Sequence, residues 1–162
     1  MQWLLVRHAI AVPSGTPGIP DDERPLTAEG EKRFRRAARG LARLVPRPDA
    51  ILSSPLPRAL RTAQLAAAAW GRLRVHAEPA LATDQFADWE TAVSRLGPIE
   101  LVALVGHEPH LSMLLAQLLG SARAERFAFK KGGVAWVEVP GALAGGGTLL
   151  GIWPPAALRE LS

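Results

Sequence analysis

Two arginines and two histidines stand where apolar stretches of this sequence give way to polar residues: Arg7, His8, Arg58 and His107. The planar guanidinium group of arginine can donate two charge-assisted hydrogen bonds to a tetrahedral dianion, a geometry that lysine does not reproduce. A neutral imidazole is a nucleophile near pH 7 and can attack phosphorus while arginines hold the equatorial oxygens. These residue types therefore predict a site that binds and transfers a phosphoryl group, provided that the fold brings them together.

The order of the apolar stretches predicts a fold that brings these four residues together. Periodicity predicts strands near 2–7, 49–53, 73–76 and 100–105, helices near 28–45, 56–70, 88–96 and 109–119, and two final strands at 133–139 and 147–153 around the loop 140–147. Strands that alternate with helices predict an α/β fold, a three-layer sandwich with a mostly parallel central sheet, helices on both faces and an antiparallel addition at the end. Ligands of such folds bind beyond the carboxyl ends of the strands, so we expect the two arginines and two histidines to converge there.

Helix N-termini next to this site would add further donors for an anion. Pro55 and Pro109 stand near two expected helix starts, and proline at the first helical position loses no hydrogen bond. Free backbone N–H groups and the helix dipole favour an anion bound at such a position. Arg61, which lies close after Arg58, is expected to be an ordinary solvated residue.

Composition favours one compact domain over residues 1–162, because 48% of the 162 residues are hydrophobic. No apolar stretch approaches the roughly 20 residues that span a bilayer, and no secretory signal is evident, so we expect a cytoplasmic protein without a membrane partner. The absence of cysteine excludes disulfides, thiolate zinc sites and cysteine nucleophiles. His107 and His110 are spaced like a metal pair, but no third ligand is evident, so neither a metal nor another cofactor is expected.

The net charge of +4 reflects a cluster of basic residues within 31–47. Apolar residues recur there at helical spacing, and cations occupy the other faces of the expected helix: Lys32, Arg35, Arg36, Arg39 and Arg43. This surface is either simply solvated or a docking patch for an acidic partner or a nucleic acid. Because no aromatic residues alternate with the charges and no nucleic-acid motif is recognised, we expect no nucleic-acid partner.

Five motifs in one order resemble the histidine phosphatase superfamily, and most closely its small SixA-like phosphohistidine phosphatases. The motifs are "LLVRHA", "RPLTAEG", "SSPLPRALRTA", "GHEPHLS" and "FKKGG", and the resemblance extends from residue 3 to about residue 153. It implies a phosphoglycerate mutase-like fold and a metal-independent hydrolase. It also implies that His8 becomes phosphorylated as the nucleophile, while Arg7, Arg58 and His107 bind the phosphoryl group.

The sequence departs from the family pattern at two places. Ala9 stands where many members have glycine, which leaves slightly less room beside the backbone. Larger members carry a carboxylate acid after the third strand, where this chain offers only Asp84, Asp88 or Glu90, and none of these is at a convincing position. The general acid is therefore unassigned.

The absence of an assigned general acid affects which substrate is expected. An alkoxide leaving from a phosphate ester benefits from a positioned proton donor, whereas the imidazole of phosphohistidine can leave neutral after protonation from solvent. Phosphohistidine on a protein is therefore the expected substrate, and the short chain without a long insertion suits an open cleft. One alternative is a phosphomonoesterase of small metabolites that uses Asp84 or Asp88 as its acid. The other is an adaptor that binds phosphate without turnover and docks partners through the basic helix.

Two further segments each allow two interpretations. The long loop 11–25 is either a lid over the site or disordered, since loops of this length in compact domains are commonly one or the other. Lys130 and Lys131 either add positive potential at the rim of the pocket or are simply exposed before a strand.

Overall fold

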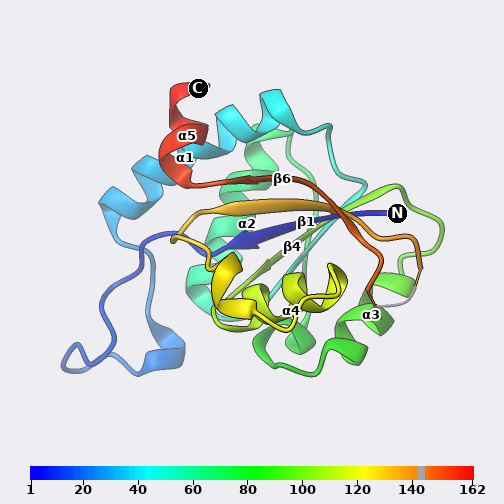
Figure 1. Ribbon diagram of the computed structural model, residues 1–162. Coiled ribbons are helices and arrows are strands. Elements are labelled where there is room, and N and C mark those ends of the chain that lie inside the picture. Colours follow the sequence, from blue (N-terminus) through cyan, green and yellow to red (C-terminus); the bar gives the residue numbers. More distant parts are fainter. Residues whose placement is uncertain (142–144) are drawn as a thin grey trace.

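A mixed six-stranded sheet forms the centre of the computed structural model, which describes residues 1–141 and 145–162 (Figure 1). The strands are β1 (Gln2–Arg7), β2 (Ala50–Ser53), β3 (Val75–Ala77), β4 (Leu101–Gly106), β5 (Val134–Glu138) and β6 (Thr148–Trp153). The α-helices are α1 (Ala28–Leu44), α2 (Pro57–Ala69), α3 (Phe86–Ser94), α4 (His110–Leu118) and α5 (Pro155–Glu160). Short 3-10 helices are η1 (Asp21–Glu23), η2 (Pro79–Ala82) and η3 (Ala124–Phe127).

The sheet has the strand order β3-β2-β4-β1-β5-β6. Strands β1 to β4 pair in parallel, whereas β5 is antiparallel to both β1 and β6. The predicted parallel sheet with an antiparallel addition at the end is thus confirmed. Its register matters for the site, because Arg7 pairs with Gly106 and Ser53 pairs with Val105. The chain therefore leaves β1, β2 and β4 at nearly the same level of one sheet edge.

Two hydrophobic cores lie on the two faces of the sheet, as a three-layer sandwich requires. Successive residues of β1 alternate between them: Leu4 and Val6 belong to the core under α1, α2 and α5, and Trp3 and Leu5 belong to the core under α3 and α4. All four side chains are buried because β1 is covered on both sides. Figure 1 shows α1 and α5 on one side of the strands and α3 and α4 on the other.

Helix α1 begins where the sequence predicts. The Thr27 side chain accepts a hydrogen bond from Gly30 N at 2.9 Å, which satisfies one of the free N–H groups of the first turn. Gly30 is needed for a second reason, since a Cβ atom there would lie 2.1 Å from the carbonyl oxygen of Ile10. Thr27 N also donates to this oxygen at 3.0 Å. The glycine thus lets the chain that leaves β1 lie directly against the start of α1.

The helices predicted near 56–70 and 109–119 are confirmed as α2 and α4. The proline at the first helical position of α2 is Pro57 rather than Pro55, and Pro109 is the N-cap of α4 rather than its first helical residue. The short helix α5 was not expected, and it packs against α1. The loop expected at 140–147 includes residues 142–144, which lie outside the described residues. Across the described part of the chain, no helix has the length and apolar character to cross a membrane.

Candidate active site

The four residues singled out by type meet at the carboxyl edge of the parallel strands. The ring centroids of His8 and His107 lie 5.2 Å apart, and both side chains are buried together with that of Arg58. The positive charges of Arg7 and Arg58 both lower the pKa of His8, so the two guanidinium groups lie within electrostatic range of the ring. The expected convergence of Arg7, His8, Arg58 and His107 is therefore present in the geometry.

The backbone beside His8 fixes the tautomer of its ring. The Nδ1 atom lies 2.7 Å from the carbonyl oxygen of Ala9, which can only accept a hydrogen bond. We therefore assign the proton of the neutral ring to Nδ1, which leaves a lone pair on Nε2. Ala9 N in turn donates to Thr62 Oγ1 at 2.9 Å, and this hydroxyl donates to the Arg58 carbonyl at 2.7 Å. The ring is thus oriented by buried contacts from helix α2.

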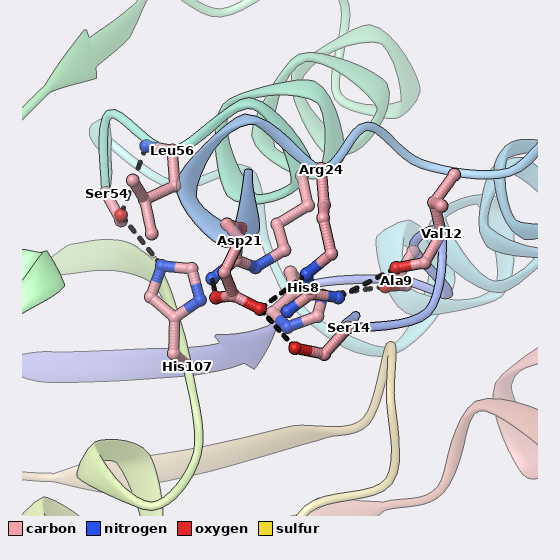
Figure 2. Close-up of polar contacts among 10 residues, drawn as sticks. His8, Ala9, Val12, Ser14, Asp21, Arg24, Ser54, Leu56 and His107 are labelled. Carbon is pink, nitrogen blue, oxygen red and sulfur yellow. Dashed lines mark hydrogen bonds and ion pairs between the residues drawn. The ribbon is translucent and has the colours of Figure 1, made fainter. Parts of the chain in front are cut away.

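His107 is held from the end of β2. Its Nε2 atom lies 2.8 Å from Ser54 Oγ, and this oxygen also accepts from Leu56 N at 3.3 Å (Figure 2). A hydroxyl that already accepts from a backbone N–H is suited to donate to Nε2. We therefore assign the ring proton to Nδ1, which is buried without a hydrogen-bond partner among the described residues. In this tautomer, His107 presents an N–H donor.

Each arginine is held by one end of its guanidinium group. Arg7 Nη1 donates to the Phe129 carbonyl at 2.6 Å, and Arg58 Nη1 donates to the Asp21 carbonyl at 2.7 Å. The Nε atoms of both arginines are buried and make no hydrogen bond within the parts of the chain that the structure describes. A buried donor without a partner costs about 1–3 kcal/mol, so such groups call for an explanation.

Burial and positive charge keep both histidines neutral at pH 7. Desolvation, reinforced by the charges of Arg58, Arg7 and Lys131, lowers the pKa of His8 to about 4, although the Ala9 carbonyl opposes this shift. Desolvation and then the charge of His8 lower the pKa of His107 to about 3. Burial also lowers the pKa of both arginines, but these groups stay cationic. The site therefore combines neutral imidazoles with fixed positive charge, which suits nucleophilic attack on a bound dianion.

The loop 11–25 supplies site residues that the sequence did not single out. Asp21 accepts hydrogen bonds from Ser14 Oγ at 2.6 Å and from Arg24 Nε at 2.9 Å, and Arg24 Nη1 donates to the Val12 carbonyl at 2.8 Å (Figure 2). Asp21 Oδ2 also lies 3.7 Å from Arg58 Nη2. The loop thus folds back onto the site and brings a third arginine to it. No property of "PDDER" alone predicts this, because the path of the loop depends on contacts with Arg58.

Glu108 connects two of the sequence motifs. Its Oε1 atom accepts from Phe129 N at 2.5 Å, and its Oε2 atom accepts from Ser112 Oγ at 2.7 Å. Phe129 belongs to "FKKGG", and its carbonyl is the group that holds Arg7. Glu108 therefore holds the Phe129 backbone that binds Arg7, and it links the segments "GHEPHLS" and "FKKGG" in space.

The three acid candidates make no hydrogen bond or ion pair with the two histidines among the described residues. Glu90 lines a cavity with Met1 and Trp3 at the amino end of β1, opposite to His8. Asp88 lines a different surface cavity, and Asp84 is exposed, with its carboxylate accepting from Gln85 Nε2 at 2.9 Å. None of the three carboxylates hydrogen-bonds to His8 or His107 in the described structure. The general acid therefore stays unassigned.

Two further expectations concern residues near the site. Arg61 is not simply solvated, because its Nε and Nη2 atoms bind the Glu31 carboxylate at 2.7 and 2.9 Å and join α2 to α1. His107 and His110 do not form part of a metal cluster: among residues 1–141 and 145–162, no three His, Asp or Glu side chains are placed to hold a metal ion.

Comparison with known proteins identifies the family. The sequence profile of the histidine phosphatase superfamily (branch 1) matches residues 3–96. An uncharacterised protein of a Picosynechococcus species is 31% identical over 140 residues, which cover 83% of this chain and 82% of that protein.

Two solved structures share the fold. The protein histidine phosphatase SixA in complex with tungstate superposes with a TM-score of 0.80 at 23% identity, over 98% of this chain and 99% of the other. The α-ribazole phosphatase from Shigella flexneri superposes with a TM-score of 0.72 at 20% identity, over 96% and 97% of the two chains. At such identities the superpositions establish the fold alone.

Proposed function

Because the chain belongs to the histidine phosphatase superfamily, whose members are phosphatases, we propose that it hydrolyses phosphohistidine on another protein with His8 as the nucleophile. Arg7, Arg58 and His107 bind the phosphoryl oxygens in this proposal, and Arg24 adds positive charge from the loop. We further propose that the reaction needs no metal ion or other cofactor.

The observation that carries the proposal is the set of unpartnered buried donors around a neutral nucleophile. Arg7 Nε, Arg58 Nε and His107 Nδ1 are buried without hydrogen-bond partners in the described chain. A phosphoryl dianion would accept from all three and offset their desolvation. His8 keeps a lone pair on Nε2 because Ala9 binds Nδ1, so the same site contains the group that attacks.

The reaction has two steps. His8 Nε2 forms a bond to phosphorus, and the bond from phosphorus to the substrate imidazole breaks, with a proton from solvent neutralising the leaving nitrogen. A water molecule then attacks the phosphorylated His8, which releases inorganic phosphate and restores the neutral ring. The arginines hold the equatorial oxygens in both steps and stabilise the developing charge.

The ionised state of the Asp21 carboxylate, which lies beside Arg58, favours phosphohistidine over alkyl phosphates as the substrate. Hydrogen bonds from Ser14 and Arg24 lower the pKa of Asp21, so this exposed carboxylate is ionised and poorly suited to donate a proton. Imidazole is a better leaving group than an alkoxide when no proton donor is positioned. The likeness in fold to a protein histidine phosphatase is consistent with this substrate.

A second candidate function is hydrolysis of a small phosphorylated metabolite, with Asp84 or Asp88 as the acid. The fold shared with an α-ribazole phosphatase favours it. The non-catalytic adaptor is the weakest alternative, because an adaptor would have no need for a buried neutral His8 beside two arginines.

The test measures phosphate release from a protein phosphorylated on histidine and from an aryl phosphate, with EDTA present, for the wild type and His8→Ala. We expect faster hydrolysis of the phosphohistidine by the wild type and none by the variant. Preference for the ester would favour the metabolite phosphatase. Binding without any hydrolysis would favour the adaptor, and loss of activity in EDTA would overturn metal independence.

A further inference from the structure

A groove of about 320 Å³ lies next to the candidate active site. Its walls come from the first turns of α1, the segment 130–132 and the start of α5, which lies along α1 in Figure 1. The lining is mainly apolar, with Ile10, Phe34, Pro154 and Pro155 among its residues. This groove contains none of the four proposed catalytic residues, so its role is separate from holding the phosphoryl group.

Cations surround the groove on three sides. Arg33 comes from α1, Lys130 and Lys131 from the segment before β5, and Arg159 from α5. Arg33 is paired with Glu29 at 3.0 Å in an exposed contact. The other three form no ion pair with any carboxylate in the described parts of the chain. The positive charge of the rim is therefore largely available to a bound partner.

The groove is continuous with the end of β1 that carries His8. Ala9 and Ile10, the two residues after His8, line its floor. Gly132 N donates to the carbonyls of Arg7 and His8 at 3.1 and 3.0 Å, and its φ of +79° is a conformation that favours glycine. The backbone thus holds the lysine-bearing wall of the groove against the end of β1, and the groove begins at the residue next to His8.

From this juxtaposition we propose that the groove binds the segment flanking the phosphohistidine of a protein substrate, and that this segment is acidic and carries an apolar side chain. The inference rests on the proposed function and adds the chemistry of the substrate. Four cations around an apolar floor complement carboxylates around an apolar anchor. A single-stranded nucleic acid would be expected to stack its bases on exposed aromatic rings, whereas Phe34 is only 2% exposed.

The test compares three substrates: free phosphohistidine, a phosphohistidine peptide flanked by glutamate and leucine, and the same peptide flanked by lysine and serine. Wild-type protein should show a kcat/KM about tenfold higher for the acidic peptide than for the basic one, as two exposed ion pairs would give. The variant Lys130→Ala/Arg159→Ala, which removes two rim cations that form no ion pair in the described structure, should lose most of this preference while hydrolysing free phosphohistidine at the wild-type rate. The matched control Arg36→Ala/Arg39→Ala removes two exposed arginines of α1 outside the groove and should keep the preference.

Direct binding separates failure of this inference from failure of the proposed function. A fluorescently labelled acidic peptide without phosphate should bind the wild type and the control, and should bind the groove variant about tenfold more weakly. This result would support the groove even if phosphohistidine were not hydrolysed. Equal binding by all three proteins, or an equal loss of preference in variant and control, would overturn the inference.

Discussion

The Nδ1 atom of His8 lies 2.7 Å from the carbonyl oxygen of Ala9. This contact between adjacent residues leaves the lone pair of His8, the proposed nucleophile, on Nε2, and it is made with alanine at position 9, where the family resemblance leads one to expect glycine. Ala9 is itself fixed because its N–H donates to Thr62 Oγ1 at 2.9 Å. The departure from the family pattern at residue 9 therefore leaves the geometry of a neutral nucleophile intact.

The two buried histidines predict a loss of stability in mild acid. Their folded pKa values, about 4 for His8 and about 3 for His107, lie below the ordinary value of 6.5. Between pH 6.5 and about 4 the unfolded chain therefore binds more protons than the folded chain, so the free energy of unfolding is largest above pH 6.5 and falls as the pH drops. Urea unfolding from pH 7 to pH 4.5 should show this fall in the wild type and a smaller one in His8→Gln and His107→Gln. The same pH dependence in all three proteins would contradict buried neutral rings.

Thr62 is predicted to position the nucleophile from helix α2. Its fully buried hydroxyl accepts from Ala9 N and donates to the Arg58 carbonyl. Thr62→Val preserves the shape but leaves the Ala9 N–H unpaired, which should lower the free energy of unfolding by about 1–3 kcal/mol and reduce kcat. Thr62→Ser retains the hydroxyl and should restore kcat. A valine variant as active as the serine variant would mean that Thr62 only fills space.

Arg58 is predicted to be irreplaceable by lysine. Its guanidinium group is held by the Asp21 carbonyl at 2.7 Å, with Nε left for the substrate, and a lysine cannot reproduce both contacts. Arg58→Lys should lower kcat/KM about 100-fold or more, as expected for loss of a preorganised donor to a charged transition state. The matched change Arg61→Lys, one turn away and paired with Glu31, should leave kcat/KM within about twofold. Similar losses in both variants would argue against a specific phosphoryl contact.

Gly30 is predicted to be essential for stability rather than chemistry. A Cβ atom at this position would lie 2.1 Å from the Ile10 carbonyl oxygen, and both backbones would have to move. Gly30→Ala should therefore lower the free energy of unfolding by about 1–3 kcal/mol, as overpacking typically does. Gly141→Ala, where a Cβ would meet nothing within 4 Å, serves as the control and should change stability little. Unchanged unfolding of the Gly30 variant would contradict the close approach.

The sequence predicts the centre of the site better than its surroundings. Arg7, His8 and His107 could be singled out because Arg7 ends β1, while His8 and His107 directly follow β1 and β4, and parallel strands end at one sheet edge. The β1 pattern is continuous and apolar, which made the strand and its end clear. The apolar pattern of β1 is a property of the local sequence, and the shared edge is a property of any regular parallel sheet.

The surroundings depend on contacts between distant segments. Arg24 and Asp21 join the site only because the loop 11–25 folds back onto Arg58, and a sequence of prolines, glycines and charges does not specify that path. Ser54 and Thr62 act through single hydrogen bonds across elements, and such residues are too common for their type to reveal the role. The helix near 56–70 was predicted, but Pro55 rather than Pro57 was expected at its start, because both prolines in "SSPLPR" are compatible with a helix start.

The central claim is that His8 carries the phosphoryl group during turnover. The most direct measurement quenches the enzyme in alkali during hydrolysis of a phosphohistidine protein and locates the covalent phosphate by mass spectrometry, with His107→Gln and His8→Gln as comparisons. Our account predicts one phosphoryl group on His8 in the wild type, and none in His8→Gln. Phosphate on His107, or steady turnover of phosphohistidine by His8→Gln, would contradict it.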